Sequence, residues 1–420
     1  MPVCVGDCSG DGAVTIDELL IGISILLGAA VPAQCPELDR NGDQLVTVDE
    51  IVTAVGVTLA GCPDLPRFPV GAYFWPDHAY GQTGSALGDL AAFGLNTVVA
   101  YYEYVKPDVP PFSGQPDCHG LVREAEVSGI DFFIGAPRGD QVRPLDEPAL
   151  AARLQATIDC VGASPRYQGW MFDEPELTGY DAPLLERATR LLRTLHSRHR
   201  VWVNFSPFAT DEQFQNLGAT ADIVGFDIYP ISDVGPRPLT AVGEYTRRAR
   251  DLAAPDTEVW MIVQAFGYSD LPNEGGHGRR PTPHELRFMV YDALIHGARG
   301  IVFFGSHQLR NTIPLDEPLW DRGVRDIARE LGEIGPALLR CGHPCPVPAA
   351  PAALVAVQCE GSDLLIAANA TAVPVAGTLR LGGDAASVRE IFDNREISVA
   401  DGVLRDDYSA YQVHVYVISP

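Results

Sequence analysis

QGWMFDEPEL, residues 168–177, is the stretch that decides how the middle of this 420-residue chain folds. A short apolar run, Gly169 to Phe172, ends in two adjacent carboxylates, Asp173 and Glu174, followed by Pro175. Short apolar runs rich in β-branched and aromatic residues are typical of buried parallel strands. The chain has seven more of them: Val70 to Trp75, Thr97 to Tyr102, Ile130 to Ala136, Val201 to Phe205, Ile223 to Ile228, Val259 to Ala265 and Gly300 to Phe304.

Amphipathic stretches with helix-start signals separate these eight runs, as at Asp146, Asp181 and Thr282. Eight strand and helix pairs predict a (β/α)8 TIM barrel, which typically takes about 250 residues. The alternative is a doubly wound open sheet, which usually has fewer strands and a phosphate-binding glycine loop; no strand end carries GxGxxG or GxxxxGK[ST]. The last helix is expected at about Leu319 to Leu339.

The carboxyl ends of barrel strands are where active sites form. Aromatic and acidic residues gather there, and neither a histidine cluster with metal spacing nor a phosphate clamp is present, so a sugar is the expected ligand. The candidate catalytic residues are Glu174, Asp173 and Asp227. The candidate substrate-binding residues are Trp75, Tyr102, Glu103, Asn204, Tyr229 and Gln264.

The two adjacent acids have competing interpretations. Successive strand residues point to opposite faces, but at a strand end both Asp173 and Glu174 can reach the pocket. Pro175 is expected to restrict Glu174 to extended backbone geometry. In the alternative without catalysis, Asp173 caps the next turn and Glu174 is a solvated loop residue.

From residue 68 to the end, the chain resembles clan A-type glycoside hydrolases, on the evidence of the barrel, a tail domain and the acid after the fourth strand. The resemblance implies that Glu174 is the acid/base. That family usually has Asn where Asp173 stands, and its nucleophilic Glu falls near Gln264, whose amide cannot form a glycosyl ester. Three alternatives remain: an acetamide-assisted mechanism with Asp173 orienting the acetamide, an inverting mechanism with Asp227 or Glu103 as base, or a barrel that only binds carbohydrate.

Two acidic segments repeat near the N-terminus, Asp7 to Glu18 and, 32 residues later, Asp39 to Glu50. Oxygen side chains at loop positions 1, 3, 5, 9 and 12, with a carbonyl at 7, form the EF-hand arrangement for calcium. The expected ligands of two structural calcium ions are Asp7, Ser9, Asp11, Ala13, Thr15 and Glu18, and Asp39, Asn41, Asp43, Leu45, Thr47 and Glu50. No cofactor is expected for catalysis.

One apolar helix follows each loop, so residues 3 to 62 resemble a dockerin. The resemblance implies a cohesin-type partner; the alternative is a calcium-stabilised cap without one. Gln44 replaces the usual glycine at position 6 of the second loop. Ile16-Asp17 and Val48-Asp49 stand where cellulosomal dockerins usually carry Ser/Thr pairs.

Composition sets the remaining expectations. A net charge of −25 with one lysine, Lys106, argues against nucleic acid and anionic membranes as partners. No run of about 18 apolar residues predicts membrane insertion, and the N-terminus lacks a signal-peptide pattern. The clustering of the nine cysteines favours disulfides and a secreted or cell-surface location, with Cys160 as a candidate unpaired thiol.

The sequence therefore predicts three domains. Residues 1–64 form the dockerin-like calcium module, residues 65–340 the barrel, and residues 341–420 a C-terminal β-sandwich, in which alternating runs such as "YQVHVYVIS" read as antiparallel strands. The expected function is that of a secreted glycoside hydrolase acting on an oligo- or polysaccharide.

Overall fold

The computed structural model describes residues 5–8, 14–39, 45–60, 67–74, 86–100, 118–197, 199–271, 277–306, 309, 313–314, 316–341, 344–381 and 387–419. The chain divides into two compact units, Met1–Arg67 and Phe68–Pro420.

The first unit is helical. Helices α1 (Ile16–Leu26) and α2 (Val48–Ala60) pack together over a small core that includes Leu38, and two short 3₁₀ helices, η1 (Pro32–Gln34) and η2 (Pro36–Leu38), lie between them in sequence. A capping box starts α1, because the Thr15 side chain accepts from the Glu18 N–H while Glu18 accepts from the Thr15 N–H. A disulfide joins Cys8 to Cys35.

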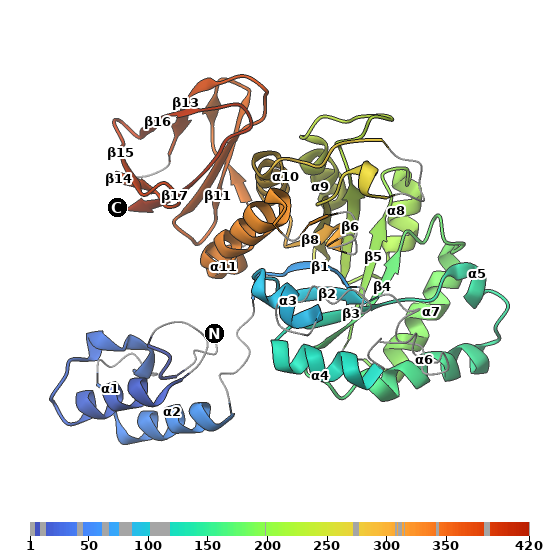
Figure 1. Cartoon of the computed structure of the whole chain (residues 1–420), viewed down its shortest axis with the longest axis horizontal. Coiled ribbons are helices and arrows are strands. Elements are labelled where there is room, and N and C mark those ends of the chain that lie inside the picture. Colours follow the sequence, from blue (N-terminus) through green and yellow to red (C-terminus); the bar gives the residue numbers. More distant parts are fainter. Residues whose placement is uncertain are drawn as a thin grey trace. The chain divides into compact units, whose positions relative to one another are not determined.

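The second unit contains the predicted barrel (Figure 1). Eight parallel strands close in sequential order, as expected of a (β/α)8 barrel. The strands are β1 (Val70–Phe74), β2 (Thr97–Ala100), β3 (Asp131–Gly135), β4 (Tyr167–Asp173), β5 (Arg200–Phe205), β6 (Ile223–Ile228), β7 (Glu258–Gln264) and β8 (Gly300–Phe304).

Helices cover the outside of the barrel (Figure 1). They are α3 (Ala86–Ala92), α4 (Cys118–Ser128), α5 (Gly139–Val142), α6 (Glu147–Val161), α7 (Ala182–Leu195), α8 (Asp211–Gly218), α9 (Ala241–Leu252), α10 (Pro283–Ile295) and α11 (Arg325–Arg340), with a 3₁₀ turn η4 (Tyr268–Asp270) and a π-helical turn η6 (Leu319–Val324). The three helix starts read from the sequence are confirmed, since Asp146, Asp181 and Thr282 cap α6, α7 and α10.

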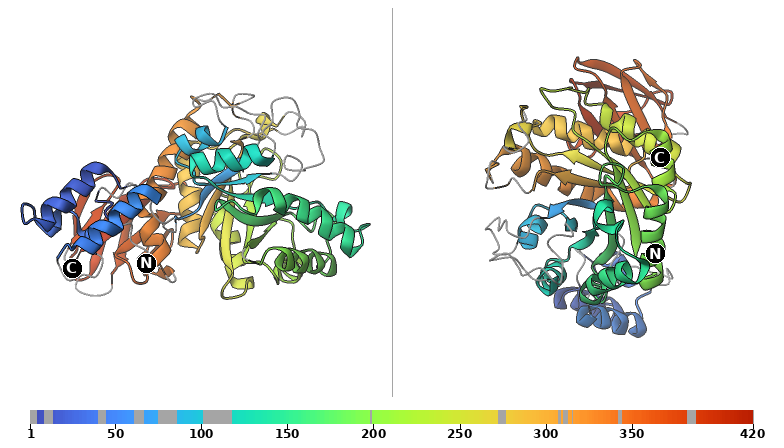
Figure 2. Two further views of the ribbon diagram at one scale, coloured as in Figure 1. Left: turned by 90° about the horizontal axis from the view of Figure 1, so that it is seen from below. Right: turned by 90° about the vertical axis from the view of Figure 1, so that its right-hand side faces the viewer.

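Antiparallel sheets follow the barrel and pack against α10 and α11 (Figures 1 and 2). One sheet has the order β10-β13-β16 and the other β15-β14-β17-β12-β11-β9, with an apolar core of their own. The strands are β9 (Pro344–Pro346), β10 (Ala349–Ala350), β11 (Leu354–Cys359), β12 (Leu364–Asn369), β13 (Val375–Arg380), β14 (Ser387–Glu390), β15 (Arg395–Ser398), β16 (Val403–Tyr408) and β17 (Val413–Ser419).

Polar contacts join these sheets to the barrel helices. Arg287 of α10 binds the Glu330 carboxylate of α11 at 2.8 Å and donates to the Val413 carbonyl of β17, also at 2.8 Å. The rings of Phe288 and Tyr411 pack 5.0 Å apart beside this pair. The barrel and the antiparallel sheets therefore belong to one compact unit.

The expectation for Cys160 was wrong. Cys160 of α6 forms a disulfide with Cys118 of α4, and Cys341 forms one with Cys359. Because α4 and α6 are separated by β3 and α5 in sequence but pack side by side, the pairing depends on tertiary structure that cysteine spacing does not reveal.

Candidate active site

Strand alternation determines which side chains enter the barrel. Met171 of β4 and Trp202 of β5 belong to an apolar cluster that fills the barrel interior. Two residues further along, Asp173 and Asn204 point the same way, because residues two apart share a face. Asp173 and Asn204 are also register partners across β4 and β5. A polar layer therefore lies directly above the apolar interior.

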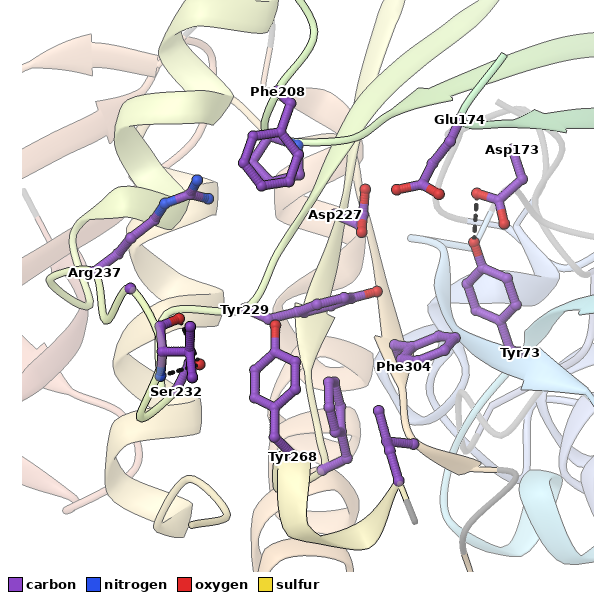
Figure 3. A pocket seen from close by; sticks show the side chains of 15 residues that line it. Tyr73, Asp173, Glu174, Phe208, Asp227, Tyr229, Ser232, Arg237, Tyr268 and Phe304 are labelled. Carbon is purple, nitrogen blue, oxygen red and sulfur yellow. Dashed lines mark hydrogen bonds between the residues drawn. The ribbon is translucent and has the colours of Figure 1, made fainter. Parts of the chain in front are cut away.

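A cavity of about 360 Å³ opens at this end of the barrel. Such a size is within the usual range for small-molecule sites, about 300–1,000 Å³. Its walls combine carboxylates with aromatic rings (Figure 3). The lining residues are Tyr73, Asp173, Glu174, Pro207, Phe208, Asp227, Tyr229, Ser232, Val234, Gly235, Arg237, Phe266, Tyr268, Leu271 and Phe304.

Asp173 is held by two donors. Its Oδ1 accepts hydrogen bonds from the Tyr73 hydroxyl at 3.2 Å and from Asn204 Nδ2 at 3.3 Å. Burial raises the pKa of Asp173 to about 6, although both hydrogen bonds lower it. Asp173 therefore changes its charge at about pH 6 and not in the acidic range of a solvated carboxyl group.

Asn204 connects Asp173 to Asp227. Its Nδ2 also donates to Asp227 Oδ1 at 3.3 Å, so the two carboxylate oxygens lie at most twice that distance apart. Burial, together with the charges of Glu174 and Asp173, raises the pKa of Asp227 well above its ordinary value. Burial and the neighbouring negative charges therefore favour the protonated form of Asp227 more than in a solvated carboxyl group. Such interacting groups titrate as a unit.

Glu174 departs from the expected backbone geometry. Its φ of 41° lies in the left-handed region, so the expectation of an extended backbone before Pro175 was wrong. Its N–H donates a hydrogen bond to the Asn204 carbonyl at 2.9 Å, which extends the pairing of β4 with β5 by one residue. Its own carbonyl accepts hydrogen bonds from the N–H groups of Leu177 and Thr178, both at 2.9 Å. The tight turn made by these bonds accounts for the positive φ.

This turn explains how two successive residues reach the same cavity. Regular alternation would direct Glu174 away from the face of Asp173. Instead both line the cavity, and in Figure 3 the Glu174 carboxylate points toward Asp227. A left-handed φ at a residue other than glycine or asparagine costs of order 1–3 kcal/mol and is concentrated at functional sites.

Glu176 was not among the candidates from the sequence. Its Oε1 accepts from the Ser206 N–H at 2.8 Å, and burial raises its pKa. Its charge also contributes to the raised pKa of Asp173. The only signal in the sequence was the presence of a third acid beside Pro175.

Aromatic rings form the lower wall of the cavity in Figure 3. Tyr229 stacks on Phe304 at 5.5 Å, and Phe266 meets both rings edge-on. Of these, Tyr229 was predicted, whereas Phe304 and Tyr73 were missed. Side chains alternate between the inside and the outside of the barrel along each strand, and Phe304 of β8 and Tyr73 of β1 are at inward-facing positions. An assignment of the inward-facing positions of each strand would therefore have identified both residues.

The other predicted binding residues have different outcomes. Trp75, Tyr102 and Glu103 lie outside the described residues. Gln264 is fully buried and does not line the cavity, which differs from the expected role. Its Oε1 accepts from the Ile231 N–H at 2.9 Å and its Nε2 donates to the Ile231 carbonyl at 2.8 Å, so the amide holds the segment after β6. Asn204 is also fully buried, and its contacts are to the acids.

The two acidic loops of the first unit have the same hydrogen bonds at their C-terminal ends. Glu18 Oε2 accepts from the N–H and hydroxyl of Thr15 at 2.7 and 2.9 Å, and Glu50 Oε2 accepts from those of Thr47 at 2.8 and 2.9 Å. Asp7 is also buried, whereas Asp39 is partly exposed and Leu45 exposed. The remaining predicted ligands, Ser9, Asp11, Ala13, Asn41 and Asp43, lie outside the described residues.

The chain is similar to known proteins in its three-dimensional structure. No protein-family model and no curated protein matches the sequence. A family 5 glycoside hydrolase from Bacteroides vulgatus superposes with a TM-score of 0.59 at 14% identity, over 84% of this chain and 90% of that one. The α-amylase of Geobacillus thermoleovorans, whose structure was solved with acarbose, superposes with a TM-score of 0.58 at 11% identity, over 85% of this chain and 100% of that one.

A third neighbour is the family 27 β-L-arabinopyranosidase of Geobacillus stearothermophilus, with a TM-score of 0.55 at 12% identity, over 84% of this chain and 96% of that one. The fold is that of barrel glycoside hydrolases. At these identities the likeness concerns the fold alone. In the part of the chain that the structure describes, no helix is long and apolar enough to span a membrane.

Proposed function

We propose that the second unit is a glycoside hydrolase that cleaves O-glycosyl bonds of an oligo- or polysaccharide. The observation that carries this proposal is the convergence of Asp173, Glu174 and Asp227 on one aromatic-walled cavity, at the strand ends where barrels place their chemistry. Glycosidases need one protonated and one ionised carboxyl. Burial and mutual repulsion raise the pKa values of Asp173 and Asp227, which favours such a mixture of protonated and ionised carboxyl groups.

Glu174 is assigned as the general acid/base. It lies at the carboxyl end of β4, directly after Asp173, and its side chain points across the cavity. The glycosidic oxygen would receive the proton from Glu174. In the acetamide-assisted mechanism the Glu174 carboxylate would then take a proton from the attacking water, whereas in the inverting mechanism Asp227 would take it. Tyr229 would lie under the sugar ring.

The second carboxyl comes from β4 or β6 in this proposal, because Gln264 of β7 is committed to backbone contacts outside the cavity. Two roles are open to it. Asp173, fixed by Tyr73 and Asn204, suits the positioning of an acetamido group that acts as nucleophile. Asp227, facing Glu174, suits a base that activates water. The retention or inversion of the anomeric centre, followed by NMR, separates these two mechanisms.

Glu174→Gln tests the general-acid assignment. The variant should lose at least about 100-fold in rate on substrates with poor leaving groups, because general acid catalysis contributes about that much. On dinitrophenyl glycosides, whose leaving group needs no proton, the first step should be nearly unchanged. Glu360→Gln, at an exposed position, is the control.

An equal loss on both substrate types would contradict the role of Glu174 as proton donor. Glycan binding by the native protein without turnover of any glycoside would instead favour the alternative, a carbohydrate-binding barrel. Secretion is proposed with the hydrolase, since the three described disulfides are compatible with an oxidising compartment.

We also propose a cohesin-type partner for the first unit, and the exposed apolar residues of its two helices support this. Ile16, Leu20 and Ile23 of α1 recur 32 residues later as Val48, Val52 and Val55 of α2, and all six are 39–71% exposed. Each set follows the i, i+4, i+7 spacing of one helix face. Large apolar side chains exposed in such a pattern are typical of protein interaction sites.

Changes on both helices test this docking surface. If both faces bind, Leu20→Asp and Val52→Asp together should abolish binding to cohesins in a titration, while either change alone should leave binding measurable through the other helix. Val127→Asp, at an exposed apolar position of α4, is the control. Failure of the native chain to bind any cohesin type would leave a calcium-stabilised cap as the explanation.

A further inference from the structure

Arg237 is the one cation among the described residues that line the cavity. It follows β6 on a loop that is closed by a hydrogen bond from its own N–H to the Pro230 carbonyl at 3.0 Å. In Figure 3, Arg237 and Phe208 lie on one side of Asp227, and Glu174 and Asp173 lie on the other. Arg237 is therefore separated from Glu174 and Asp173 by the position of Asp227.

The guanidinium of Arg237 packs on aromatic rings. Its central carbon lies 5.8 Å from the ring centroid of Phe208 and 5.6 Å from that of Tyr245. These rings attract a cation through their π faces, but they provide no carboxylate for its N–H groups. Among the described residues, no carboxylate pairs with Arg237.

Arg248 provides a comparison on the same ring. Its guanidinium carbon also lies 5.6 Å from the Tyr245 centroid, but it has a carboxylate partner, Asp211, at 2.7 Å. The position of Arg248 is therefore explained by contacts within the protein. The contacts of Arg237 leave its planar donor groups available, and such groups match a carboxylate or sulfate in geometry.

We infer that the substrate is an acidic glycan, and that Arg237 binds an anionic substituent, a uronic acid carboxylate or a sulfate ester, on a sugar unit beside the scissile bond. This inference rests on the proposed function, because it places the sugar chain in the same cavity. With a net charge of −25, the protein repels anions at long range. Selectivity for an acidic sugar therefore has to come from a short-range contact such as this one.

The test measures binding rather than turnover. Full-length protein carrying Glu174→Gln is titrated calorimetrically with oligogalacturonate and with glucuronate-bearing xylo-oligosaccharides, each beside its carboxyl-reduced form. Sulfated and desulfated oligosaccharides form a second arm that distinguishes the two anions. The acidic member of a pair should bind at least about 10-fold more tightly, as expected for hydrogen bonds to a charged group.

Variants in the same background assign the effect to Arg237. Arg237→Gln should remove the preference for the acidic form while leaving the affinity for the neutral form within about twofold, and Arg237→Lys should retain part of it. Arg405→Gln, at an exposed position of β16, is the control. Thermal melting of each variant confirms that the fold is kept.

Equal binding of acidic and neutral forms, or an equal loss of both in Arg237→Gln, would overturn the inference. The proposed function can fail separately: an Arg237-dependent preference for acidic glycans, combined with no turnover by the native protein, would support the inference and refute the hydrolase. If none of these oligosaccharides binds, the inference is overturned, and the proposed function is then decided by whether the native protein turns over any glycoside.

Discussion

At the scale of single residues, the cavity depends on how carboxyl groups are kept close together. Asn204 donates from one nitrogen to both Asp173 and Asp227 and thereby offsets part of their repulsion. Tyr73 adds a second donor to Asp173. Burial nevertheless prevails, as the raised pKa values of both acids show. The site therefore stores unfavourable electrostatic energy at pH values where Asp173 is ionised.

Asp173→Asn should stabilise the protein, and more so at high pH. The pKa of Asp173 is about 6 in the folded state and about 3.9 in an unfolded chain. The contribution of Asp173 to the stability of the folded state is fully present below the pKa of the unfolded chain, and it is lost as the pH rises through the folded-state pKa of about 6. We therefore expect a gain in the free energy of unfolding of up to about 3 kcal/mol at pH 8, because each pKa unit is worth about 1.4 kcal/mol, and of less than about 1 kcal/mol at pH 4.

Urea unfolding at both pH values, followed by tryptophan fluorescence, measures this gain. All five tryptophans lie between residues 68 and 420, so the signal reports the second unit alone. Asp256→Asn, at an exposed position, is the control. A gain at pH 4 as large as that at pH 8 would show that repulsion and desolvation are not its cause. Activity should fall in the same variant, as in other trade-offs between stability and function.

At the scale of elements, the sequence predicted the barrel well because each strand has a local signal. All eight apolar runs form strands, and the bounds of two of them, Ile223–Ile228 and Gly300–Phe304, agree to the residue. What could not be predicted depends on contacts between elements. The left-handed φ of Glu174 arises from a turn tied to β5, and the Cys118–Cys160 pair depends on how α4 packs against α6.

The candidate site shows the same division. Asp173, Glu174, Asp227 and Tyr229 were found because they lie within two residues of the end of an apolar run, and they line one cavity. Gln264 follows the same pattern yet turns to the backbone of residue 231, since a buried amide must satisfy its hydrogen bonds. Arg237 lies on a loop, nine residues beyond the last residue of β6. The apolar pattern of a strand does not predict which residues of such a loop reach the cavity.

Close strand packing around β6 gives a prediction at this scale. A Cβ atom at Gly225 would lie 1.8 Å from the Trp260 carbonyl oxygen of β7. Because this oxygen belongs to the backbone, the clash can be relieved only if β6 and β7 move apart. Gly225→Ala should therefore destabilise the second unit by at least about 1–3 kcal/mol. The same fluorescence-detected unfolding measures it.

Gly332→Ala is the matched control for that change. Gly332 lies within α11, and a Cβ there would meet nothing within 4 Å. Alanine should therefore stabilise α11 by about 0.5–1 kcal/mol, because it loses less backbone entropy than glycine. Similar effects of the two substitutions would contradict the steric argument.

At the scale of the whole molecule, the two units differ in how they can be stabilised. The second unit has a large apolar core shared by the barrel and the antiparallel sheets. Residues 1–64 contain ten acidic side chains and one basic one, Arg40, and no aromatic residue. A small core with so much negative charge is expected to depend on added stabilisation, here a disulfide and the proposed calcium ions.

Calcium removal should therefore loosen only the first unit. The carboxylates at the ends of the two loops, Glu18 and Glu50, are buried and similarly bonded, which fits a hard cation that prefers oxygen ligands. With a chelator, amide hydrogen exchange in α1 and α2 should accelerate at least about tenfold, since metal binding in such modules is coupled to folding. The tryptophan-detected unfolding of the second unit should not change.

Two substitutions make this prediction specific. Glu18→Gln and Glu50→Gln together should give the fast exchange even when calcium is present. Singly, Glu18→Gln should lower calcium affinity more, because Gln44 at the sharp turn of the second loop is expected to weaken that site already. If neither the chelator nor the substitutions change the amide exchange rates in α1 and α2, the acidic loops do not hold calcium. The Cys8–Cys35 disulfide and the apolar contacts between the helices would then be sufficient to keep the first unit folded.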